Sequence, residues 1–74
     1  MSQILNKKAI DALELRAARF IKKLVNEDQM TDRNTLINYT ITHLVWFSDI
    51  SDLSYEMAEK ISIREYTKFK LRSN

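Results

Sequence analysis

The sequence contains neither glycine nor proline, and this double absence restricts the possible folds and functions more than any motif does. Glycine permits positive φ angles and close backbone approach, so phosphate-binding loops, dinucleotide-binding turns and nucleophile elbows all depend on it. Two-residue hairpins usually need Asn-Gly or Asp-Gly, which disfavours an internal β-meander. We therefore expect a mainly helical protein that is not an enzyme.

Length and composition indicate one small domain, residues 1–74, of which 45% are hydrophobic. A chain of this size buries a modest part of its surface, and oligomerisation is a common source of stability. The chain has no cysteine and only one histidine, His43, so it lacks the ligands of a structural zinc site. No segment resembles a membrane span or a signal peptide. We expect a cytoplasmic protein with no metal, cofactor, membrane association or evident small-molecule substrate.

Charge is distributed unevenly along the chain. Residues 1–24 carry six basic and two acidic groups, giving +4, and residues 60–74 carry five basic groups and one acidic group, again giving +4. Residues 25–59 carry one basic and seven acidic groups, giving −6. Two basic ends flanking an acidic middle indicate a polyanionic partner or self-association between unlike faces.

Hydrophobic periodicity predicts three helices, at about residues 8–27, 32–47 and 51–61. The first has one apolar stripe, formed by Ile10, Leu13, Ala17, Phe20, Ile21 and Leu24. We expect Asn26 to terminate it in a left-handed conformation. Thr31 or Asp32 is expected to cap the second helix, although its β-branched and aromatic residues also suit a strand. Asp49 or Ser51 is expected to begin the third.

Residues 62–72 instead follow the period of a strand. Thr67, Phe69 and Leu71 would lie on one face, and Lys68, Lys70 and Arg72 on the other. A single strand cannot satisfy its backbone hydrogen bonds, so we expect it to pair with its copy across a two-fold axis. The expected product is a homodimer, open to higher-order assembly. The alternatives are a frayed basic tail and a third helix that continues beyond Ile61.

A paired strand of this composition suits the major groove of DNA. Lys68, Lys70 and Arg72 would read base edges, while Arg64 would contact phosphates. On the first helix, Lys22 and Lys23, with Arg16 and Arg19 beside them, form a basic stripe that either solubilises the protein or lies along a phosphate backbone.

The segment "TDRNTLINYTI" resembles the second helix of ribbon-helix-helix DNA-binding proteins. The resemblance implies that Thr31, Arg33 and Asn34 contact a DNA phosphate near the start of this helix, in keeping with anion binding at helix N-termini. In that family the ribbon precedes the first helix. Here either the N-terminal "SQILNKK" is the ribbon, or "KFKLR" takes its place in a rearranged order.

Apolar residues along the second half of the chain are expected in the core or at a dimer interface. They are Ile37, Ile41, Leu44, Trp46, Phe47, Phe69 and Leu71. An exposed partner-binding patch at Trp46 and Phe47 is the alternative. His43 is interpreted as a partly buried or surface side chain, and Asp49, Asp52, Glu56 and Glu59 as helix caps and a solvated face.

These observations together predict a transcriptional regulator, such as a repressor, that binds double-stranded DNA as a ribbon-helix-helix-like dimer. The predicted fold is mainly α with one short strand per chain, and an all-α three-helix bundle is the alternative. The alternative function is a small protein-interaction module or inhibitor that binds a host protein.

Overall fold

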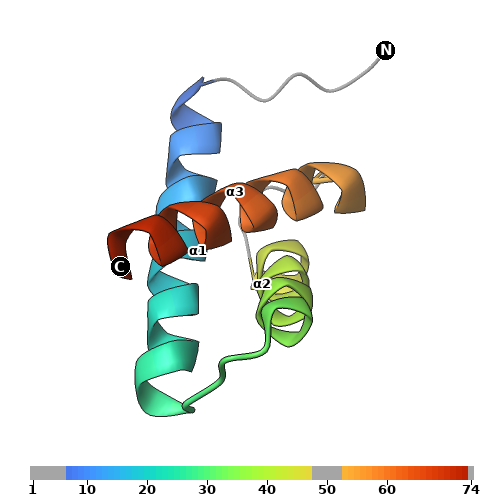
Figure 1. Ribbon diagram of the computed structural model, residues 1–74. Coiled ribbons are helices and arrows are strands. Elements are labelled where there is room, and N and C mark those ends of the chain that lie inside the picture. The colour runs from blue at the N-terminus through green and yellow to red at the C-terminus, as the bar shows by residue number, and fades with distance from the viewer. Residues whose placement is uncertain (1–6, 48–52, 74) are drawn as a thin grey trace.

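The computed structural model describes residues 7–47 and 53–73, which form three helices and no strand. They are α1 (Lys7–Glu27), α2 (Arg33–Phe47) and α3 (Tyr55–Ser73). The C-terminal half of α3 crosses the middle of α1, and α2 lies beside the lower part of α1 (Figure 1). Each helix contacts the other two, so they enclose one core. The expectation of a mainly helical protein is confirmed, and the all-α three-helix alternative fits.

Helix α1 buries four of the six residues of its predicted apolar stripe, and the other two, Ile10 and Phe20, are half-buried. Leu13, Ala17, Ile21 and Leu24 are all buried, and their spacing places them on one face. The left-handed residue after the helix is Gln29, with φ of 53°, rather than the predicted Asn26.

Helix α2 begins at an Asp32 cap. The Asp32 carboxylate accepts hydrogen bonds from the backbone amide of Thr35 at 2.9 Å and from its hydroxyl at 2.8 Å. These bonds, the backbone one foremost, lower the pKa of Asp32. The inner face of α2 contains Leu36, Ile37, Thr40, Ile41 and Leu44. The buried Thr40 hydroxyl donates to the Leu36 carbonyl oxygen at 2.7 Å, which satisfies it within the helix.

Helix α3 includes the whole segment predicted as a strand, so the strand prediction for residues 62–72 was wrong. The alternative in which the third helix continues beyond Ile61 describes the structure. Ser54 caps this helix, because its hydroxyl oxygen accepts a hydrogen bond from the Met57 amide at 3.1 Å. The predicted starts, Asp49 and Ser51, lie outside the described residues.

The strand prediction failed because the inner face of α3 is partly polar. Its buried residues are Ala58, Ile61, Ser62, Glu65 and Tyr66, which recur at helical spacing. Two of the five are polar, so the apolar residues alone show an interrupted stripe.

The fold does not fit the ribbon-helix-helix family, whose dimer requires a β-ribbon. The segment "KFKLR" belongs to α3, and no described residue forms a strand. The other proposed ribbon, "SQILNKK", lies outside the described residues as far as Asn6. The resemblance of residues 31–41 is therefore a likeness between helices and does not extend to the fold.

Candidate functional site

Exposed aromatic side chains gather on the outer face of α2. Trp46 is 74% exposed, Phe47 is 64% exposed and Tyr39 is 53% exposed. Tyr39 and Trp46 are seven residues apart, so they lie on the same side of the helix. We call Tyr39, His43, Trp46 and Phe47 the aromatic surface. Large aromatic side chains lose much favourable burial energy when they remain in water.

His43 joins the aromatic surface to α1. Its ring stacks on Phe20 with centroids 4.0 Å apart and planes 5° apart, and Phe47 lies tilted against it at 5.3 Å. Burial lowers the pKa of His43, and the positive charges of Arg16 and Lys23 lower it further. The lowered pKa favours the neutral imidazole in the three-ring stack.

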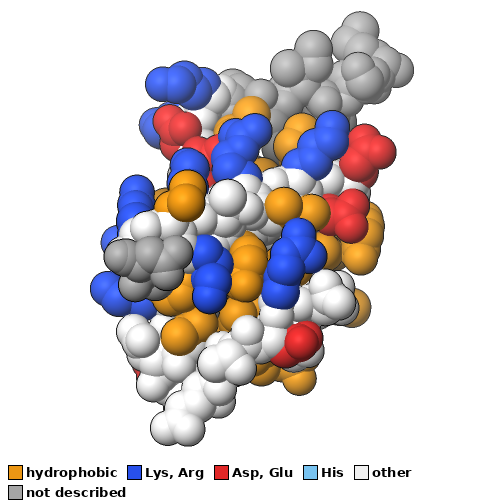
Figure 2. Space-filling view, in the orientation of Figure 1, with side chains coloured by type: hydrophobic (Ala, Val, Ile, Leu, Met, Phe, Trp, Pro, Cys, Tyr) orange, Lys and Arg blue, Asp and Glu red, His pale blue; other side chains and the backbone are white. Residues whose placement is uncertain are grey.

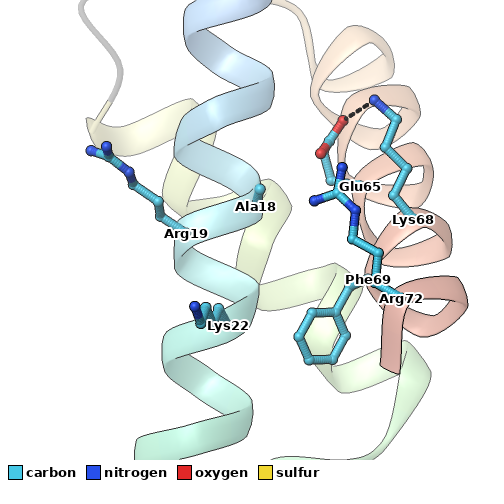
Figure 3. A pocket seen from close by; sticks show the side chains of 7 residues that line it. All are labelled: Ala18, Arg19, Lys22, Glu65, Lys68, Phe69 and Arg72. Carbon is cyan, nitrogen blue, oxygen red and sulfur yellow. Dashed lines mark hydrogen bonds and ion pairs between the residues drawn. The ribbon is translucent and has the colours of Figure 1, made fainter. Parts of the chain in front are cut away.

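A second feature is the basic pocket, a cavity of about 290 Å³ between α1 and α3 (Figure 3). It is lined by Ala18, Arg19 and Lys22 from α1 and by Glu65, Lys68, Phe69 and Arg72 from α3. The nearly buried Glu65 carboxylate accepts a hydrogen bond from Lys68 Nζ at 3.1 Å. In the view of Figure 2, lysine and arginine side chains are spread over the surface among hydrophobic ones.

The fold brings three of the predicted DNA contacts together at the basic pocket. Lys22, predicted to contact phosphate, faces the same cavity as Lys68 and Arg72, which were predicted to read bases. On a helix, Lys70 lies on the opposite side from Lys68 and Arg72, because residues two apart are separated by about 200°. The predicted ribbon, which would have aligned Lys68, Lys70 and Arg72 on one face, is absent from the described residues. Their contact with DNA stays a prediction.

The other predicted phosphate contacts do not line the pocket. They are Lys23, Thr31, Arg33, Asn34 and Arg64, all of them exposed. The Arg33 guanidinium lies 5.9 Å from the centre of the Tyr66 ring. Arg64 forms an ion pair with Glu14 of α1 at 2.9 Å, so its guanidinium already has a carboxylate partner within the chain.

The residues predicted at a core or dimer interface lie in three different environments. Ile37, Ile41 and Leu44 belong to the core of the single chain. Phe69 is half-buried beside the basic pocket. Trp46, Phe47 and Leu71 are exposed.

Two contributors were missed from the sequence. Tyr39 was not assigned to any surface, although its seven-residue spacing from Trp46 could have indicated a shared helix face. Glu65 was not assigned to any site. On a helix, its three-residue spacing from Lys68 would have predicted the ion pair that the structure contains.

No group of three or more metal-ligating side chains comes together within residues 7–47 and 53–73. None of the described helices is both long and apolar enough to cross a membrane. Comparison of the chain with models of protein families, with curated proteins and with solved structures gave no match. The aromatic surface and the basic pocket are therefore the features from which function is inferred.

Proposed function

We propose that this protein is a small helical interaction module that binds a partner protein through the aromatic surface. The observation that most supports this is the exposure of Trp46 beside Phe47 at the end of α2. Tryptophan is enriched among the residues that dominate interface energetics. Burying a large apolar side chain contributes about 1.5–3 kcal/mol, so a partner that covers both rings would gain a large part of its affinity there.

The charges near the aromatic surface indicate the chemistry of the partner. Arg16 and Lys23 are exposed side chains of α1 whose positive charges lower the pKa of His43. Interfaces commonly combine an apolar centre with a polar rim of complementary charge. The expected partner therefore offers an apolar pocket with acidic residues at its rim.

Regulation through duplex DNA has less support. Base reading depended on a ribbon, and residues 62–72 are helical instead. The basic side chains on α1 and α3 still favour polyanions, but phosphate contacts alone carry no sequence information. The predicted homodimer stays a prediction, in which a second copy of the chain is the partner of the aromatic surface.

Affinity capture followed by measurement with purified partner tests the proposal. Trp46→Ala combined with Phe47→Ala should weaken partner binding at least about tenfold, because each truncation of a central aromatic typically costs more than 1 kcal/mol. Tyr55→Ala combined with Leu71→Ala is the matched control, since it removes two similarly exposed apolar side chains from α3. A partner that binds both double variants with equal affinity would refute the proposal.

Trp46 also reports on self-association, because it is the only tryptophan in the chain. If the partner is a second copy, its emission should shift to shorter wavelength as protein concentration rises, and light scattering should show a dimer. Constant emission together with a monomeric mass would assign the surface to a different protein.

A further inference from the structure

The basic pocket is formed by two helix faces that lie against each other. On α1, Ala18 and Lys22 are four residues apart, and on α3, Glu65, Phe69 and Arg72 recur at helical spacing. The Phe69 ring projects into the space between the helices, and the Arg72 side chain extends towards Glu65 (Figure 3). The cavity of about 290 Å³ is near the lower limit for small-molecule sites.

Positive charge exceeds negative charge in this pocket. Four basic side chains and one carboxylate line it, so its net charge is +3. Lys68 is paired with Glu65, whereas Lys22 and Arg72 have no ion-pair partner in the described part of the chain. The Arg19 guanidinium points away from α3 and adds a cation at the rim (Figure 3). Repulsion among these cations favours the binding of an anion.

Glu65 adds an acceptor among the cations. Its carboxylate is nearly buried and accepts a hydrogen bond from Lys68. A carboxylate has about four acceptor positions, so it can accept hydrogen bonds from a ligand as well. A simple anion would be repelled by this carboxylate and would leave those positions unused. A ligand that presents a phosphate to Lys22 and Arg72 and a hydroxyl group to Glu65 would satisfy both kinds of group. Its apolar part would contact Phe69.

We propose that the basic pocket binds a small phosphate ester of a hydroxylated, partly apolar molecule, such as a mononucleotide. The phosphate is held by Lys22 and Arg72, with Arg19 turning inward from the rim. Glu65 accepts a hydrogen bond from a ligand hydroxyl, and Lys68 keeps the carboxylate oriented. This site is separate from the aromatic surface, so it does not depend on the proposed protein partner.

Titration of the ¹⁵N-labelled protein with AMP at low ionic strength tests the site. We expect saturable shifts of the amide signals of residues 18–22 and 65–72. Lys22→Gln combined with Arg72→Gln should weaken AMP binding at least tenfold. Lys23→Gln combined with Lys70→Gln is the matched control, because it removes the same charge from exposed neighbours outside the pocket lining and should change affinity less than twofold. Circular dichroism of each variant checks that the helices are intact.

Other probes separate the contributions of phosphate and hydroxyl groups. Adenosine and inorganic phosphate should each bind at least tenfold more weakly than AMP. A 5′-phosphorylated oligonucleotide that binds as AMP does, with the same loss in the pocket variant, would identify a strand end as the source of the phosphate. The proposal is overturned by the absence of saturable shifts, by equal losses in both double variants, or by inorganic phosphate or unphosphorylated duplex DNA binding as tightly as AMP.

Discussion

Replacing Ser62 with alanine is expected to stabilise the protein. The Ser62 side chain is 0% exposed, and its hydroxyl has no hydrogen-bond partner among the described residues. An unsatisfied buried polar group costs about 1–3 kcal/mol. Alanine removes that cost and is also the better helix former, by about 0.5 kcal/mol. Since some packing around the oxygen atom is lost, the expected net gain in unfolding free energy is about 1–2 kcal/mol.

Urea denaturation monitored by circular dichroism measures this gain. In a domain of this size, each 1 kcal/mol raises the melting temperature by about 4–8 °C, so thermal melting gives a second reading. Thr40→Val is the matched control, because Thr40 is equally buried but its hydroxyl donates to the Leu36 carbonyl oxygen. Removing this satisfied hydroxyl should reduce stability by about 0.5–1.5 kcal/mol.

The two substitutions should therefore have opposite signs. If Ser62→Ala lowers the unfolding free energy as Thr40→Val does, the Ser62 hydroxyl is hydrogen-bonded in solution. The assignment of an unsatisfied polar group to the inner face of α3 would then be refuted.

Three further substitutions test local features of the fold. Gln29→Gly should raise the unfolding free energy by about 0.5–1 kcal/mol, because glycine adopts positive φ without the steric cost that other residues carry; an unchanged or lower urea midpoint would contradict this. Asp32→Ala should lower stability at neutral pH, and the difference should shrink under strong acid. The lowered pKa of Asp32 means that its contribution disappears only as the pH falls through that lowered value, which urea titrations across the acid range would follow. For His43, stability should decline as the pH falls below about 6.5, because the unfolded chain takes up the proton more readily than the stacked ring does. His43→Phe should remove that part of the pH dependence in melting experiments, and an unaltered pH profile would show that other groups cause it.

Helix α1 could be predicted closely because its inner face is uniformly apolar. Leu13, Ala17, Ile21 and Leu24 repeat at helical spacing with no polar residue among them, so local pattern and tertiary burial agree. In α2, Ile37, Ile41 and Leu44 were predicted at the core or a dimer interface and are buried in the core, but the outer face of this helix carries further apolar side chains. Periodicity alone therefore could not decide whether Trp46 lies in the core or at the surface.

The sequence by itself determined the mainly helical class, because it lacks the turn residues of β-hairpins and carries a long apolar stripe in its first third. Only the tertiary structure decided that residues 62–72 are helical, since Ser62 and Glu65 occupy an inner face that the other two helices cover. Only the tertiary structure formed the basic pocket, because Lys22 and Arg72 are distant in sequence and become neighbours where α3 crosses α1. The C-terminal segment in which basic and apolar residues alternate is thus part of α3. Some of its side chains line the basic pocket and the others face solvent, and long-range packing decides which do which.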